Sequence, residues 1–183
     1  MRRLLPFRDR SGNAAVEMAL VTPLLLALLF GSVEMGNFFM SEHALAKQVR
    51  DGARYAARLS LSSSYSCPGT VFEDPNATSD IINVTETGAV SGTGFPRWRP
   101  EYWARTCGDD TQPVTVTIRC VPKSDIDTGD TGFTGVYTGL DGDIPVAKVT
   151  GRVKYQSVLS QLGFTGATNI CLQADSEAAV QGI

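Results

Sequence analysis

The chain has 183 residues, of which 43% are hydrophobic and 19% are charged. This balance excludes a disordered chain and a pore built from many spans, and the length favours one modest domain with an appendage. The net charge of -3 gives no overall preference for nucleic acid. The charge is unevenly spread, since residues 1–58 hold eight basic and five acidic side chains, whereas residues 59–183 hold eight basic and fourteen acidic ones. The two parts are therefore expected in different surroundings.

A basic N-terminal segment precedes a long apolar run. Residues 1–10 carry four arginines against one aspartate, and residues 18–33 carry no charge. A helix over 18–33 would be about 24 Å long, which is short of a bilayer core of about 30 Å, whereas residues 14–40 suffice and include two glutamates near the ends. We predict a basic leader over 1–12 and one transmembrane helix over 13–40. Because the arginines favour the cytoplasmic side, the C-terminal part is predicted to be exported.

A cleaved signal peptide is the alternative explanation of this run. The run is longer than the usual hydrophobic region of roughly 7 to 15 residues, and no small-x-small site comes directly after it. Ala44-Leu45-Ala46 offers such a site, but only after Glu34 and Glu42. Cleavage there would make Lys47 the N-terminus of a secreted or tethered binding module held together by disulfides.

Gly12 and Glu17 form a second pattern at the start of the apolar run. A carboxylate in lipid is costly and usually has a partner. Cleavage after Gly12 would provide one, because it creates a cationic amine at Asn13 that the Glu17 of a neighbouring subunit can approach. The plainer alternative is a glycine at a helix start and a glutamate whose side chain reaches the interface.

Residues 11–36 read SGNAAVEMALVTPLLLALLFGSVEMG and resemble the TadE-like family of the bacterial tight-adherence (Tad, or Flp) pilus machinery. The resemblance rests on a glycine, a glutamate five residues later, a proline and a second glutamate within the run, which are here Gly12, Glu17, Pro23 and Glu34. The sequence RDGARYAAR, residues 50–58, is also similar to the segment after the span in that family. Two residues depart from the family pattern: Met18 stands where Phe is usual and Asn37 where Arg is common.

The resemblance implies a structural minor pilin or pseudopilin of the bacterial inner membrane, needed for assembly of pili used in adhesion and biofilm formation. A dedicated prepilin peptidase would cut it after Gly12. Its other partners would be pilin or pseudopilin subunits in homo- or hetero-oligomers, the inner-membrane assembly platform and membrane lipid, with no nucleic acid. Glu17, Pro23 and Glu34 would lie where subunits pack. Because the peptidase is a different protein, no enzyme activity, cofactor or metal is expected of this chain.

Residues 41–59 are predicted to extend the membrane helix as an amphipathic helix. Apolar or small residues recur at helical spacing on one face, at Leu45, Val49, Ala53 and Ala56. One continuous helix of about 47 residues over 13–59 is therefore expected, kinked or loosened at Pro23. The other face carries a basic row that either faces solvent or contacts an acidic neighbouring subunit: Lys47, Arg50, Arg54 and Arg58.

The exported part, residues 60–183, is predicted to hold a small antiparallel sheet. Alternation predicts strands over 114–121 and 146–155, with a third over 169–174. Residues 59–70 resemble a linker, and residues 74–105 show little periodicity and predict no regular element. The expected fold class is α+β, with the long N-terminal transmembrane and amphipathic helix packed on this pilin-like, disulfide-containing sheet domain.

All four cysteines come after the span: Cys67, Cys107, Cys120 and Cys171. An even number in an oxidising compartment predicts two disulfides, with three connectivities open. Zinc is disfavoured because there is no CxxC pair and the single histidine lies beside the membrane. Cys120 shares the apolar parity of its strand and Cys171 does not, so a bond between these two is not obvious.

Two further stretches have both a plain and a functional interpretation. Five aspartates between residues 125 and 143 are typical of solvated turns, although calcium binding by them stays open. The sequence RWRPEYWAR, residues 97–105, interleaves aromatic and basic residues as single-strand nucleic-acid sites do, but a set this short more often caps a core.

Overall fold

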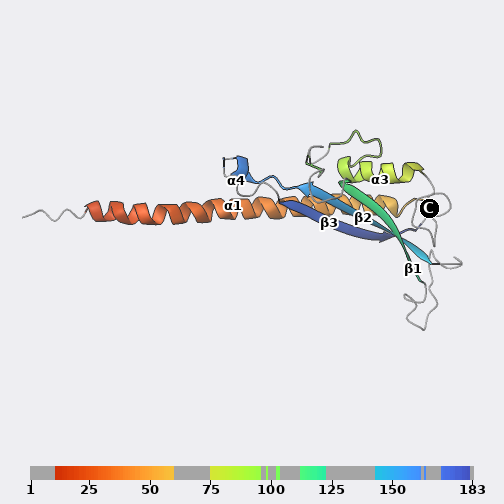
Figure 1. Cartoon of the computed structure of the whole chain (residues 1–183), viewed down its shortest axis with the longest axis horizontal. Coiled ribbons are helices and arrows are strands. Elements are labelled where there is room, and N and C mark those ends of the chain that lie inside the picture. The colour runs from red at the N-terminus through yellow and green to blue at the C-terminus, as the bar shows by residue number, and fades with distance from the viewer. Residues whose placement is uncertain are drawn as a thin grey trace, which may run out of the picture.

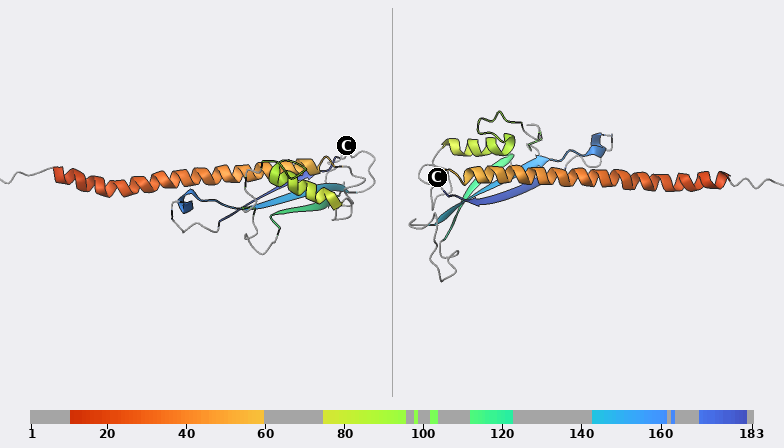
Figure 2. Two further views of the ribbon diagram at one scale, coloured as in Figure 1. Left: turned by 90° about the horizontal axis from the view of Figure 1, so that it is seen from above. Right: turned by 180° about the vertical axis from the view of Figure 1, so that it is seen from behind.

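The computed structural model describes residues 11–59, 75–95, 98, 102–103, 112–122, 143–161, 163 and 170–181. A single long helix, α1 (Ser11–Ala56), runs along the whole molecule (Figure 1). It confirms the continuous helix expected from the sequence, and it continues unbroken through Pro23. Its N-terminal part projects away from the rest of the chain, whereas its C-terminal part forms the centre of a small folded domain (Figures 1 and 2).

The domain contains one three-stranded antiparallel sheet in the order β1-β2-β3. Its strands are β1 (Val114–Val121), β2 (Ile144–Lys154) and β3 (Cys171–Ala179). The first strand has the predicted bounds, the second begins two residues earlier and ends one residue earlier than predicted, and the third is longer and later than 169–174. The α+β class with a long apolar helix and a small antiparallel sheet is confirmed.

The core lies between α1 and the inner face of the sheet. The apolar face predicted for the helix is buried, with Leu45, Val49 and Ala56 at 0% exposure. These side chains join the inward-facing residues of β2, among them Val149 and Val153, in one cluster. Burial of that apolar surface, at roughly 25 cal/mol per Å², is what holds the helix on the sheet.

Helix and sheet approach closely because β2 has a glycine at the crossing. A Cβ atom added at Gly151 would lie within 2.7 Å of the Val49 side chain, so a larger residue there would push α1 off the sheet. Glycine inside a strand often marks such a close approach. Both tryptophans of the chain, Trp98 and Trp103, are buried in the same core, at 7% and 3% exposure. The core-capping interpretation of residues 97–105 is therefore confirmed for these two side chains.

Two helices lie where the sequence predicted none. Helix α3 (Pro75–Thr87) buries Ala77, Ile81 and Thr85, at a spacing of four residues, against α1 and β1. Its sequence contains several threonines and asparagines, which have low helix propensity and weaken the hydrophobic periodicity that would predict a helix. The stability of α3 therefore comes from its packing on α1 and β1. The short helix α4 (Val158–Gln161) comes after β2 and lies beside α1 at the border of the domain (Figure 1).

The cysteines of the described residues lie at opposite ends of the sheet. Cys120 pairs with Pro145 of β2, and Cys171 pairs with Lys154. Nine residues of strand separate those two positions, which is about 30 Å, whereas a disulfide needs Cα atoms within about 7 Å. Cys120 and Cys171 are therefore not bonded to each other, and neither is a free thiol. Cys67 and Cys107 lie outside the described residues, as do four of the five aspartates considered for calcium.

Candidate functional site

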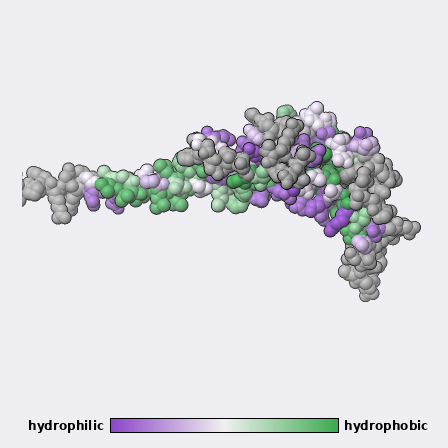
Figure 3. Space-filling view, viewed as in Figure 1, coloured by the Kyte–Doolittle hydropathy of each residue, from purple (hydrophilic) through white to green (hydrophobic). Residues whose placement is uncertain are grey.

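The N-terminal part of α1, from residue 12 to residue 33, is exposed along its whole length. We call these 22 residues the free segment, and residues 34–56, which the rest of the chain contacts, the covered segment. At 1.5 Å per residue the free segment is about 33 Å long, which matches a bilayer core of about 30 Å. Figure 3 shows it as a predominantly hydrophobic rod that leaves a more hydrophilic domain.

Within the part of the chain that the structure describes, α1 is the one helix long and apolar enough to cross a membrane. Its most apolar window has a mean hydropathy of 2.0 and no buried residue. Two hydroxyl groups of the free segment bond to carbonyls of the helix itself: Thr22 donates to Met18 at 2.7 Å and Ser32 to Leu29 at 2.8 Å. Such bonds suit a lipid environment because they leave no hydroxyl unsatisfied.

Glu17 is the one ionisable side chain of the free segment. Its side chain is exposed, and no hydrogen bond or ion pair joins it to a described residue. Gly12 lies five residues earlier at the beginning of α1, where a Cβ atom would meet nothing within 4 Å. Asn13 is exposed beside it. The structure thus places the predicted processing residues together at an accessible helix end, with a carboxylate one helical turn beyond Asn13.

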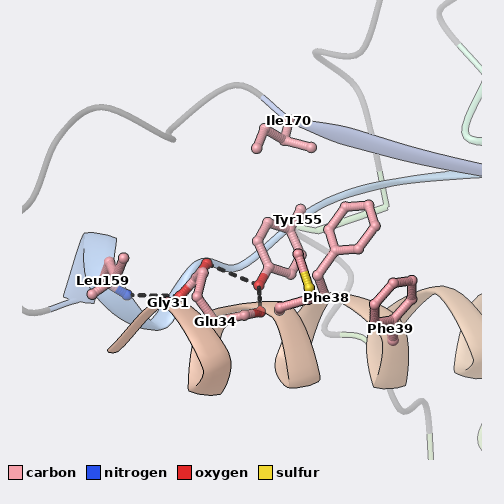
Figure 4. A pocket seen from close by; sticks show the side chains of 8 residues that line it. Gly31, Glu34, Phe38, Phe39, Tyr155, Leu159 and Ile170 are labelled. Atoms are coloured by element: carbon pink, nitrogen blue, oxygen red, sulfur yellow. Dashed lines mark hydrogen bonds between the residues drawn. The ribbon is translucent and has the colours of Figure 1, made fainter. Parts of the chain in front are cut away.

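Glu34 differs from Glu17 because the domain provides partners for it (Figure 4). The Tyr155 hydroxyl donates to its Oε1 atom at 2.9 Å, and the backbone N–H of Leu159 donates to its Oε2 atom at 3.1 Å. The donors come from the end of β2 and from the first turn of α4, more than 120 residues away in sequence. The carboxylate therefore fastens the α4 region to the helix at the point where the free segment ends.

Asn37 completes this cluster, which we call the Glu34 clasp (Glu34, Asn37, Tyr155, Gln156 and Leu159). The Asn37 side-chain amide donates to the Tyr155 hydroxyl at 3.0 Å and to the Gln156 carbonyl at 2.9 Å. One amide group thus bonds both to the Tyr155 side chain and to the backbone of the residue that follows it. The sequence pattern marks Asn37 only as a departure, and the structure gives it a positioning role.

Tyr155 is the centre of the clasp and is 3% exposed. Burial raises the pKa of its hydroxyl, and the hydrogen bond to Glu34 raises the pKa further. The hydroxyl consequently stays protonated across the physiological range and remains a donor to the carboxylate. Its ring also packs edge-on against Phe38, with centroids 5.3 Å apart at 72°, an arrangement that aromatic pairs favour.

The basic row, three residues of α1 and one residue just after its end, is exposed at all four positions: Lys47, Arg50, Arg54 and Arg58. Arg54 lies 3.8 Å from Asp51 in an exposed pair that contributes little stability. On the outer face of the sheet, Asp175 and Glu177 are paired with Lys148 of β2, and Glu177 also with Arg119 of β1, at 3.2 to 3.8 Å.

No group of three or more His, Cys, Asp or Glu side chains that could hold a metal ion occurs within the described ranges. Within the described residues, the free segment and the clasp together present a hydrogen-bonded carboxylate at Glu34, a carboxylate without a partner at Glu17 and a long apolar surface. The long apolar surface suits insertion into lipid and packing against other apolar surfaces.

Comparison with known proteins gives one match. Residues 12–54 match the family model described as TadE-like protein. No similar chain is found among curated proteins, and none among solved structures. The matched range begins at Gly12, contains both glutamates of the span and ends inside the covered segment, so it includes the helix half of the clasp but none of the sheet. The resemblance predicted from the sequence is confirmed over these residues, and the chain carries a TadE-like segment at residues 12–54.

Proposed function

We propose that this protein is a structural minor pilin or pseudopilin of a Tad pilus, anchored by its free segment and matured by cleavage between Gly12 and Asn13. The TadE-like match of residues 12–54 supports an association with the Tad pilus in general. The finer role rests on one observation: Glu17 is a carboxylate on an apolar, exposed helix and has no partner among the residues that the structure describes. A charge in that position needs a partner from another molecule.

The maturation step provides the partner. Hydrolysis of the Gly12–Asn13 peptide bond by a prepilin peptidase releases the basic leader and leaves an ammonium group on Asn13. In an assembly of parallel helices, the Glu17 carboxylate of one subunit pairs with that ammonium group of its neighbour. The pair sets the register between subunits, since a desolvated charge that loses its partner costs several kcal/mol, about 3–5 in measured cases.

Orientation in the inner membrane is set by the arginines before Gly12. Basic residues remain on the cytoplasmic side, so the sheet domain is exported. In that oxidising compartment we propose two disulfides, each joining one strand cysteine, Cys120 or Cys171, to one of Cys67 and Cys107. The sheet register supports this arrangement because it separates the two strand cysteines. Peptide mapping without reduction tests it, and a linked pair of peptides containing Cys120 and Cys171 would contradict it.

The alternative, a cleaved signal peptide ahead of Lys47, fits the structure poorly. Cleavage after Ala46 would divide α1 within the covered segment and remove Leu45, which is 0% exposed in the core. Mass spectrometry of the mature N-terminus separates the possibilities. We expect Asn13 as the first residue. Lys47 would support the secreted module, and an intact Met1 would leave only an anchor.

The test of the mechanism is Glu17→Ala, with Glu42→Ala as the matched control on an exposed position of the covered segment. We expect Glu17→Ala to be processed normally and to be lost from assembled pili, whereas Glu42→Ala assembles normally. Normal pilus output from Glu17→Ala would remove the ion-pair role. If Glu17→Ala is not cleaved, Glu17 would instead be needed for recognition by the prepilin peptidase.

The basic row provides a second contact between subunits in this proposal. Arg54→Glu combined with Arg58→Glu is expected to weaken assembly and to reduce its dependence on salt, because both side chains are exposed and lie outside the core. Unchanged assembly of the double variant at low salt would leave the basic row as a solvated face.

A further inference from the structure

An apolar pocket of about 370 Å³ lies at the junction of the free segment and the domain. Figure 4 shows how α1 forms one wall and how Tyr155, the α4 region and the beginning of β3 form the other. Its lining consists of Gly31, Glu34, Met35, Phe38, Phe39, Tyr155, Leu159 and Ile170. The pocket is therefore built by segments that the fold brings together from both ends of the sequence.

The described lining offers hydrocarbon and nothing for a polar ligand. Its one charged group is Glu34, and both carboxylate oxygens of Glu34 already accept hydrogen bonds from Tyr155 and Leu159. The Tyr155 hydroxyl is in turn held by Asn37. The aromatic walls are fixed by edge-on contacts of Phe38 with Tyr155 and with Phe39, at centroid distances of 5.3 and 5.9 Å. An occupant must consequently be apolar.

The depth of the pocket identifies the source of that occupant. Gly31 lies 19 residues beyond Gly12, which is about 28 Å along the helix. With Gly12 at the inner boundary of a bilayer core of about 30 Å, as the proposed anchoring requires, the pocket opens at the outer boundary. Three aromatic rings line it at that level, where aromatic residues are enriched in membrane proteins. The apolar surface of the free segment continues directly into it, since Val33 and Met35 are 50% and 61% exposed.

We propose that this pocket binds the upper part of a phospholipid acyl chain, the methylenes nearest the glycerol. Such chains surround the free segment at this depth in every copy. A neighbouring copy anchored at the same depth would present Met35 and Phe39 here, and those side chains already form the walls of its own pocket. The bound chain would cover the apolar junction while the Glu34 clasp stays closed.

The test uses the full chain in phosphatidylcholine vesicles that contain a small fraction of a phosphatidylcholine with a photoactivatable diazirine on one acyl chain. Two probes carry the diazirine either near the glycerol or at the terminal methyl. We expect the probe with the diazirine near the glycerol to label Leu159 and Ile170 more strongly than the other probe does. The probe with the diazirine at the terminal methyl should instead label residues near the middle of the free segment. The proposal does not depend on cleavage after Gly12, so uncleaved protein is suitable.

Substitutions that fill the pocket provide the control. Gly31→Phe and Gly36→Phe are matched, because a Cβ atom meets nothing within 4 Å at either glycine and only Gly31 lines the pocket. We expect Gly31→Phe to lose the labelling of Leu159 and Ile170 and Gly36→Phe to keep it. Ile170→Phe fills the pocket from the opposite wall and is expected to lose the labelling of Leu159. Fluorescence of the buried Trp98 and Trp103 checks that each variant is folded.

Two outcomes would overturn the inference. The first is labelling spread evenly along α1 and unchanged by Gly31→Phe, which would mean ordinary contact with surrounding lipid. The second is protection of the pocket from lipid together with cross-links between chains at Met35 or Phe39, which would identify a second copy as the occupant.

Discussion

The free and covered segments of α1 are parts of one helix with opposite ways of satisfying an acidic side chain. Glu34, at the beginning of the covered segment, accepts hydrogen bonds from Tyr155 and Leu159 of its own chain. Glu17, in the free segment, has no partner among the described residues. The same residue type therefore closes the fold at one end of the span and, in our proposal, joins subunits at the other. What differs is the availability of donors in the same molecule.

The largest difference in unfolding free energy between the two segments is expected when a leucine of each is replaced by alanine. Leu45→Ala removes a side chain that is 0% exposed in the core, so it is expected to lower the free energy of unfolding by about 2–5 kcal/mol. Leu28→Ala, at 63% exposure in the free segment, is expected to leave it unchanged. Denaturant titration of the full chain in detergent, monitored by tryptophan fluorescence, measures both. Equal effects would mean that the free segment also packs within its own chain.

The second-largest difference in folding stability is expected between alanine substitutions of the two glutamates, Glu34 and Glu17. Glu34→Ala leaves the Leu159 N–H without its acceptor and leaves the Tyr155 hydroxyl only the backbone carbonyl of residue 34, at 3.2 Å, so it is expected to cost about 1–3 kcal/mol of folding stability. Glu17→Ala is expected to cost none, although it should abolish assembly. The same denaturant titration compares them. A stable Glu34→Ala protein with unchanged hydrogen exchange at Leu159 would show that the clasp contributes nothing.

The glycines of the two segments give a third comparison. A Cβ atom at Gly52 would collide with the Thr85 side chain of α3, whereas one at Gly31 meets nothing within 4 Å. Gly52→Ala is expected to destabilise the domain by about 1–2 kcal/mol, because the overpacking outweighs the gain in helix propensity. Gly31→Ala should not destabilise it. Adding Thr85→Ala to Gly52→Ala should restore part of the loss, and no restoration would place the strain elsewhere.

The smallest expected effect concerns a half-buried carboxyl of the domain, which has no counterpart in the free segment. Burial raises the pKa of Glu86 on α3. The charged form is therefore disfavoured by folding: the cost is absent below the ionisation range of an unfolded glutamate, near pH 4, and is complete once the pH exceeds the folded pKa. Glu86→Gln should stabilise the domain at pH 7 by less than about 1 kcal/mol, since the side chain is only half buried. The gain should vanish in titrations below pH 4.

The elements that a sequence pattern predicts well are those with strong periodicity. The helix is expected over 13–59 from the apolar run and from apolar residues at helical spacing after it, and the first strand is expected over 114–121 from alternation of apolar residues. Helix α3 is missed because Thr85 occupies one of its buried positions, where its hydroxyl bonds to the Ile81 carbonyl at 2.7 Å. A threonine counts as polar in a hydrophobic periodicity, so the sequence does not show that this one is buried and lies against Gly52 of α1.

The candidate site is predictable to a similar degree. Gly12 and Glu17 stand out because their spacing is local, and Glu34 stands out because it lies in an apolar run. The role of Glu34 in the fold is not predictable, since its donors are 121 and 125 residues away and come from the end of β2 and from a short helix without a sequence signal. Asn37 and Tyr155 are likewise ordinary residues until the fold places them side by side.

In our proposal one helix is both the membrane anchor and the centre of the exported domain, and the structure has no loop between these two parts of α1. A tilt or rotation of the free segment in the bilayer would therefore tilt or rotate the sheet by the same angle, because both are attached to one continuous helix. Pulling on the domain would likewise load the membrane anchor directly. Force can thus pass between lipid and the exported surface along a single backbone, whose hydrogen bonds run parallel to the load.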